Sequence, residues 1–179
     1  MSVQFQDKFA SGAENGWAKL ASRAARVVLA RQDMSYTELA GELAKLGVAE
    51  SAHAVEAKVS RGTFRFAFFL QLIAGSRTDC PYLWASALSS TETWQARSAA
   101  VFAAEMTGQP WLNWQMLSNR LREIGVSLPS ESLQAQIESG SFSTTLFLQC
   151  AAVCRFDSIY RFLDTSELHR VALANSPQS

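Results

Sequence analysis

Basic side chains in the first half of the chain have types and spacings that suit phosphate binding. They form two groups of three: Lys19, Arg23 and Arg26, then Lys58, Arg61 and Arg65. The first group recurs at helical spacing and therefore falls on one face of a helix. Lysine and arginine in such positions can neutralise phosphates or reach guanine edges. The alternative is a solvated surface, on which cations near a helix end also favour the helix dipole.

An internal repeat defines the elements that position these side chains. Lys58–Gln71 reads KVSRGTFRFAFFLQ, and 78 residues later Gln136–Gln149 reads QIESGSFSTTLFLQ. The register holds without a gap over 50 aligned pairs, from Ser35/Asn113 to Trp84/Phe162, and 14 of these pairs are identical. A repeat of about 70 residues suits a small helical domain rather than a solenoid. We therefore expect two units with one common fold.

The repeated pattern predicts an all-α protein with four to five helices in each unit. Ser35 and Glu38 have the spacing of a capping box, and Gly47 is suited to the left-handed conformation that ends a helix. Residues 1–15 are expected to be an arm, and a short helix is expected after Asp164. The helices expected in the first unit open at Trp17 and then cover residues 35–46, 51–61 and 65–75.

Charge separates the two units that the repeat defines. We place the units at residues 16–84 and 94–163, with a Ser- and Thr-rich boundary between them, where Ser89 and Glu92 have capping-box spacing. The first unit carries nine basic and six acidic residues, whereas the second carries five of each. Because the whole chain has no net charge, only this local asymmetry bears on a nucleic-acid partner.

The first unit contains a helix-turn-helix pattern, in which a glycine-led turn joins two helices that each carry an apolar stripe. This arrangement would leave the second of the two helices exposed. The pattern resembles the phage-repressor-like DNA-binding domains, although the spacings between its landmarks are about three residues longer. The second helix is therefore expected to be longer and the turn looser. The residues that carry the pattern are Leu39, Ala40, Leu43, Gly47, Val48, Val55, Val59 and Gly62.

Both units also resemble an uncharacterised bacterial domain family of unknown function. The resemblance rests on the Gly47-Val48 turn, the run from Lys58 to Phe64, and the Phe68-Phe69 pair. The second unit keeps the glycines and phenylalanines but replaces Lys58, Ser60 and Arg61 with Gln136, Glu138 and Ser139. This resemblance implies a helix-turn-helix-like fold and brings no established activity.

The DNA-binding hypothesis assigns the first helix and the exposed third helix of unit one to the interface, because helix-turn-helix proteins use both surfaces. The second unit is then expected to serve dimerisation or the docking of a protein partner. The alternative is an adaptor in which both units bind protein. The candidate DNA-binding residues are Lys19, Arg23, Arg26, Ser51, His53, Ala54, Ala57, Lys58, Arg61 and Arg65.

Residues for catalysis or metal binding are scarce. Cys150 and Cys154 lie four residues apart, but no second pair or neighbouring histidine completes a metal site, so they are expected to be buried small side chains. No phosphate-binding glycine loop or nucleophile elbow occurs. We therefore expect no enzyme, no cofactor and no metal. The absence of a signal-peptide pattern and of a bilayer-length apolar run favours a cytoplasmic protein with no membrane partner.

Two further expectations concern apolar side chains. Phe64 and Phe142 each follow a helix-ending glycine and are expected in the core. The helix from Trp94 to Met106 is apolar around much of its circumference, so it needs a partner, and Trp111 and Trp114 add aromatic surface nearby. That partner is either a second protein chain or the first unit of the same chain.

Overall fold

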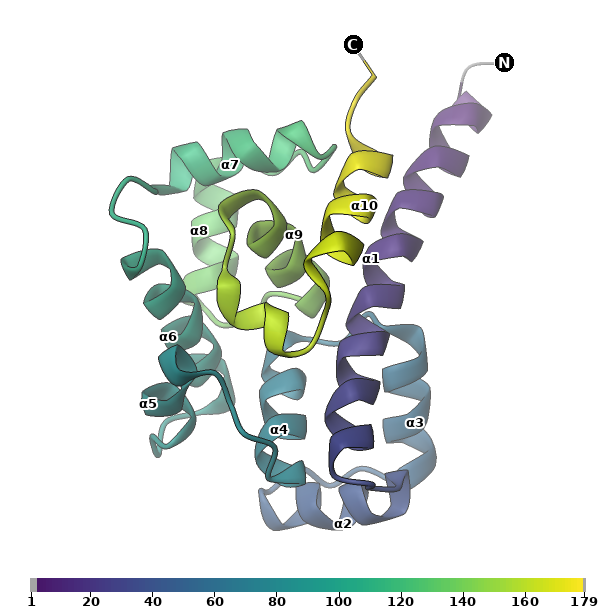
Figure 1. Ribbon diagram of the computed structural model, residues 1–179, viewed down its shortest axis with the longest axis vertical. Helices are drawn as coiled ribbons and strands as arrows, with labels where there is room; N and C mark the ends of the chain where they lie inside the picture. The colour runs from purple at the N-terminus through teal and green to yellow at the C-terminus, as the bar shows by residue number, and fades with distance from the viewer. Residues whose placement is uncertain (1–2, 179) are drawn as a thin grey trace.

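The computed structural model describes the backbone of residues 3–178 and the side chains of residues 15–178. Over this range the chain is all-α, as the repeat pattern predicts (Figure 1). The elements are α1 (Val3–Arg31), α2 (Tyr36–Lys45), α3 (Ala52–Arg61), α4 (Phe66–Ser76), η1 (Tyr82–Trp84), α5 (Ala85–Leu88), α6 (Trp94–Thr107), α7 (Trp114–Glu123), α8 (Ser130–Glu138), α9 (Thr144–Cys154), η2 (Asp157–Arg161) and α10 (Thr165–Asn175).

The repeat in the sequence is a repeat in the structure. Helices α2 and α7 begin and end 78 residues apart, as do α4 and α9. Gly47 has a φ of +84° and Gly125 a φ of +79°, so both turns use the left-handed conformation that glycine adopts at little cost. After each glycine, the valine amide closes the turn by donating to the leucine carbonyl five residues earlier, at 2.9 Å in unit one and 3.0 Å in unit two.

Local capping explains where five of these helices begin, namely α2, α3, α6, α7 and α9. The capping box before α2 is present: the Ser35 amide donates to Glu38 Oε2 at 2.8 Å, and the Glu38 amide donates to Ser35 Oγ at 3.2 Å. The capping box expected at Ser89 and Glu92 is wrong. Helix α6 is capped by Thr93, whose Oγ1 accepts from the Ala96 amide at 3.1 Å. Thr93 supplies this side-chain cap, whereas Ser89 ends α5.

The two units meet around a local two-fold axis. Arg65 and Ser143, which are matched positions of the repeat, form an isolated antiparallel bridge. Its hydrogen bonds are reciprocal: the Phe66 amide donates to the Phe142 carbonyl at 3.1 Å, and the Thr144 amide donates to the Phe64 carbonyl at 3.0 Å. An antiparallel pairing of equivalent residues requires a two-fold relation. Accordingly, α2 and α7 lie at opposite ends of the molecule (Figure 1).

One hydrophobic core serves both units. Helix α4 packs against α6 of the second unit, and α9 packs against α1 of the first. Phe64 and Phe142 are buried in this core, which confirms the prediction for both. Phe66, which the sequence pattern did not single out, lies at the centre of the core, with its ring stacked on that of Phe147 at a centroid distance of 4.2 Å. One face of helix α6 is therefore covered within the same chain, by α4.

Helix α1 is longer than the sequence pattern predicts. Its backbone is helical from Val3, so the expectation of an arm over residues 1–15 is wrong for the described part of that segment. The helix α10, expected after Asp164, packs beside the early part of α1, where a Cβ at Gly16 would lie 3.1 Å from Val171 Cγ1. None of the helices described has both the length and the apolar character needed to cross a membrane.

Candidate functional site

Helix α3 occupies the place of the exposed helix in a helix-turn-helix. Val55 and Val59 are buried and hold α3 against α2 and α1. His53 and Ala54 are exposed on the outer face of its first turns. Ser51 is the N-cap, and its Oγ accepts from the Ala54 amide at 3.1 Å. The first turns of α3 are therefore exposed to solvent.

The end of α3 and the start of α4 form a basic pocket. Lys58, Arg61 and Arg65 line this pocket, which has a volume of about 370 Å³. Lys58 pairs with Glu50, and its Nζ lies 4.6 Å from the centroid of the Phe68 ring. The Arg65 guanidinium donates to the Ser141 carbonyl of the second unit. Arg61 is exposed, so of the three it keeps the most freedom to bind a phosphate.

Helix α1 brings part of the first basic group beside this pocket. The backbone of Gly62 lies against α1, such that a Cβ there would be 1.8 Å from the Ala18 carbonyl oxygen. Lys19 is the next residue and is exposed, as is Arg26 two turns later. Arg23 differs, because its guanidinium pairs with Glu167 of α10. Across the described residues, no carboxylate lies within 4.0 Å of the cationic groups of Lys19, Arg26 or Arg61.

The ten predicted site residues thus fall into three groups. The first turns of α3 carry Ser51, His53, Ala54 and the half-buried Ala57. The basic pocket holds Lys58, Arg61 and Arg65. The face of α1 carries Lys19, Arg23 and Arg26. The cations best placed for phosphate contact are therefore Lys19, Arg26 and Arg61.

Sequence reasoning missed the polar side chains that share the basic pocket. Thr63 and Gln71 lie in the first unit, and Gln95 reaches the pocket from α6 of the second. Gln95 carries no local signal, because only the packing of α6 against α4 brings it there. In the repeat, Gln95 corresponds to Ala18 of unit one. A Cβ at Gly140 would lie 1.9 Å from the Gln95 carbonyl oxygen, just as a Cβ at Gly62 would lie 1.8 Å from the Ala18 carbonyl oxygen. The Gly62–Ala18 contact is therefore repeated in unit two.

The second unit lacks cations at the six positions that match the two basic groups of the first. Lys19, Arg23 and Arg26 correspond to alanines, and Lys58, Arg61 and Arg65 correspond to glutamine or serine. Helix α6 consequently presents small apolar side chains where α1 presents charges. The residues of unit two in question are Ala96, Ala100, Ala103, Gln136, Ser139 and Ser143.

The cysteines behave as small core side chains. Cys150 and Cys154 are buried in α9, which confirms that expectation. Burial raises the pKa of Cys154 to about 12, although the nearby Arg120 acts in the opposite direction. Because the thiolate is the nucleophilic form, such a thiol is unreactive near neutral pH. These two side chains contribute to the packing of α9 in the core.

The fold and the candidate site define an all-α protein made of two helix-turn-helix-like units in tandem. The family model described as "Domain of unknown function (DUF6471)" matches the chain twice, at residues 17–75 and 94–159. The protein belongs to this family, and the two matches coincide with the two structural units. Neither the curated proteins nor the solved structures contain a match to this chain.

Proposed function

We propose that the protein binds double-stranded DNA through its first unit and acts as a transcriptional regulator. The observation that carries this proposal is the uncovered α3 beside the exposed cations Lys19, Arg26 and Arg61. The cations can neutralise backbone phosphates, while the outer face of α3 enters the major groove. The second unit lacks these charges at the matched positions, so the proposal assigns DNA contact to one unit only.

The arrangement of α2 and α3 supports a docking mode like that of phage-repressor-like domains. The two helices pack through a turn led by Gly47, and the small Ala54 permits a close approach of α3 to the duplex. His53 is exposed in the first turn of α3 and has hydrogen-bonding capacity toward bases or phosphates. Lys58 has a lesser role, because Glu50 and Phe68 already engage its ammonium group.

The test measures binding to a random-sequence duplex by fluorescence anisotropy at several salt concentrations. The variant is Lys19→Glu with Arg61→Glu, which reverses two exposed charges that make no described ion pair. Binding by the wild-type protein should weaken steeply as salt rises, because neutralised phosphates release counterions. The variant should lose most of this affinity, and the salt slope should fall by about 1 for each phosphate contact removed.

Two control variants make the result specific to the first unit. Gln136→Glu with Ser139→Glu introduces two acids at the end of α8, the matched position of unit two. Arg122→Glu with Arg170→Glu reverses two exposed charges elsewhere on the surface. Both controls should bind like wild type. Absence of salt-sensitive binding by the wild-type protein would reject the proposal, and equal weakening by all three variants would reject the assignment to unit one.

A second candidate function is protein docking through the second unit, as a homodimer or with another protein. A groove of about 430 Å³ on α6 favours it, because the groove is lined by small and apolar side chains in place of the stripe of cations on α1. These residues are Ala99, Ala100, Ala103, Met106, Trp114 and Ile137, and the acidic Glu138 also lines the groove. Light scattering tests the homodimer. Ala103→Arg places a cation at the position that matches Arg26 of unit one, and this variant should be monomeric. A wild-type protein that is monomeric at high concentration excludes that version.

A further inference from the structure

A second cleft lies entirely outside the proposed DNA-binding surface. It opens between the ends of α6 and α9 and the start of the 3-10 helix η2, and its volume is about 510 Å³. Volumes of this size are typical of small-molecule sites. The residues that matter for its chemistry are Glu105, Trp111, Arg120, Arg155, Asp157 and Ser158.

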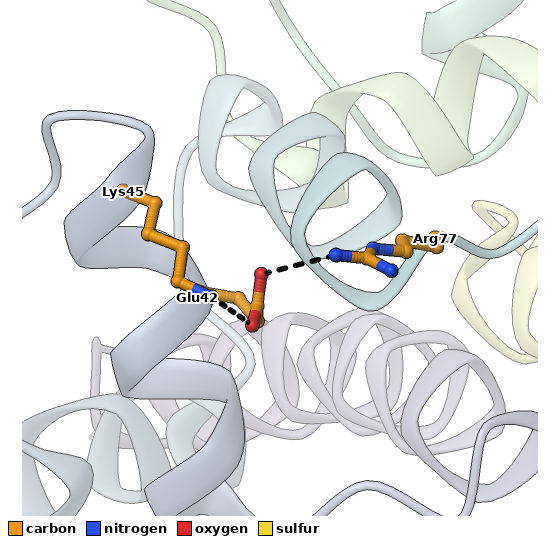
Figure 2. Close-up of polar contacts among 3 residues, drawn as sticks. All are labelled: Glu42, Lys45 and Arg77. Carbon is orange, nitrogen blue, oxygen red and sulfur yellow. Dashed lines mark hydrogen bonds and ion pairs between the residues drawn. The ribbon is translucent and has the colours of Figure 1, made fainter.

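The residues of the first unit that match Arg120 and Arg155 of this cleft are Glu42 and Arg77, and they belong to an ion-pair cluster. Glu42 of α2 lies 2.7 Å from Lys45 Nζ and 4.0 Å from Arg77 Nη2, so its carboxylate sits between two cations (Figure 2). Arg77 ends α4 with a left-handed backbone, at a φ of +56°. In this unit, the charges at the ends of α2 and α4 therefore compensate one another.

The second unit exchanges the acidic and basic positions of this helix, with Arg120 in place of Glu42 and Glu123 in place of Lys45. Arg155 ends α9 with a φ of +55°, as Arg77 ends α4, but the residue at the position of Glu42 is Arg120. No described carboxylate, including that of Asp157, lies within 4.0 Å of either guanidinium. The Arg120 guanidinium lies over the Trp111 ring, 5.0 Å from its centroid. Two exposed guanidinium groups on one cleft can together hold a carboxylate or a phosphate group.

The interior of the cleft holds a buried carboxyl group that the first unit lacks. Glu105 is 3% exposed, and its Oε1 accepts from Trp84 Nε1 at 2.8 Å. The matched residue of unit one is Val28, an ordinary core side chain. A buried carboxyl group is costly in a core unless it is well paired. Its presence beside a cleft, together with the loss of the ion pair, indicates a binding site rather than relaxed packing.

We propose that this cleft binds a small organic anion, with its carboxylate or phosphate group held between Arg120 and Arg155. The planar or apolar body of the ligand packs against Trp111 and Val153, and a hydrogen-bond donor on that body faces Glu105. Arginine supplies fixed, paired donors for the anionic group, whereas the aromatic face accepts any planar body. This anion site is separate from the proposed DNA-binding surface, because the residues that would contact the ligand lie in the second unit.

Isothermal titration calorimetry on the full chain tests the proposal with two probes and their truncated forms. AMP and anthranilate each combine an anionic group, a planar body and an amino group, and they distinguish a phosphate from a carboxylate ligand. Adenosine and aniline lack the anionic group, and inorganic phosphate lacks the body. At least one probe should bind at least about tenfold more tightly than its truncated forms, since a charge-assisted hydrogen bond contributes about that factor.

Charge variants locate the binding to the cleft. Arg120→Glu restores the acid that unit one has at this position, and Arg155→Asn removes the second cation with a residue that tolerates the left-handed backbone. Each should weaken binding at least about tenfold. Arg122→Glu, an exposed residue of the same helix, should leave it unchanged. The proposal is overturned if neither probe binds, if inorganic phosphate binds as tightly as both probes, or if Arg120→Glu binds like wild type while its melting temperature is unchanged.

Discussion

The individual cations of this protein differ in what holds them, although the sequence presents them as equivalent. Arg23 pairs with Glu167 and Lys58 with Glu50, so both already have structural partners. Lys19 and Arg61 lie exposed and close to the junction between α1 and α3. Because only a free cation can neutralise a phosphate without breaking another contact, exposure and pairing rank these residues better than charge alone.

At the residue scale, Phe66 should be among the most sensitive positions. Its ring is fully buried and stacks on Phe147 and Phe142, with centroids at 4.2 and 5.3 Å. Phe66→Ala would leave a cavity between the two units and should lower the free energy of unfolding by about 3–5 kcal/mol. Urea denaturation measures this change. Tyr82→Ala is the control, because Tyr82 is 91% exposed and its truncation should change stability by about 0.5 kcal/mol or less.

Glu105 should give the folded protein a distinct dependence on pH. Burial raises the pKa of Glu105 above its ordinary value of 4.5, against hydrogen bonds from Ser158 and Trp84 that lower it. Between that ordinary value and the raised one, the folded state binds more protons than the unfolded state. The contribution of Glu105 to stability therefore falls as pH rises through this window.

Glu105→Gln should remove this contribution while keeping an acceptor for Trp84. Urea midpoints measured from about pH 4.5 upward should fall less with rising pH for the variant than for wild type. Comparing the two proteins cancels the carboxylates they share, including Glu38, whose pKa is lowered by its hydrogen bond with the Ser35 backbone. Parallel pH profiles for the two proteins would show that Glu105 is not perturbed.

At the scale of elements, two glycines set how closely the helices of each unit approach. Gly62 ends α3 against α1, and Gly140 follows α8 against α6, with φ values of +69° and +70°. In each unit, the glycine meets a backbone carbonyl of the first helix. Both units therefore have glycine here for two reasons: a helix ends at this position, and two helices cross there at close range.

Replacement of Gly62 should test this crossing directly. In Gly62→Ala, the Cβ would lie 1.8 Å from the Ala18 carbonyl oxygen, so α1 and α3 must separate. We expect a loss of at least about 2 kcal/mol in the free energy of unfolding. Gly41→Ala is the matched control, because nothing lies within 4 Å of that Cβ in the exposed face of α2. It should raise stability by about 0.5–1 kcal/mol; similar losses in both variants would contradict the close approach.

At the scale of the whole molecule, the tandem repeat is built like a dimer within one chain. The bridge between Arg65 and Ser143 lies on the local two-fold axis, and each unit covers part of the core of the other. Duplication allows the two copies to diverge while the packing between them is retained. In this chain, the first copy keeps the cations, whereas the second carries the alanine groove of α6 and the cleft around Arg120.

A shared core predicts that the two units unfold together. Neither α4 nor α9 has its apolar face covered by its own unit alone, so unfolding one unit would expose the core of the other. Urea unfolding followed by far-UV circular dichroism and by tryptophan fluorescence should give coincident single transitions. Phe66→Ala should shift both curves equally. Two separated transitions would show instead that each unit folds on its own.

The sequence by itself determined the features that rest on neighbouring residues. The Ser35–Glu38 capping box, the turns led by Gly47 and Gly125, and the all-α repeat all follow from local propensities and from a period that can be counted. Helix ends are local because their capping groups lie within a few residues of one another. The buried positions of Phe64 and Phe142 were also predictable, since each follows a glycine and precedes an apolar helix.

Only the tertiary structure decided what depends on distant residues. It placed Phe66 between the two units, paired Arg23 with Glu167, and brought Gln95 to the basic pocket. It also joined Glu105 and Arg120 in one cleft, although neither has a recognisable motif in the sequence. The reason is physical: a side chain far along the chain becomes a neighbour only through packing, so its charge or its aromatic ring gives no local signal of the contact it will make.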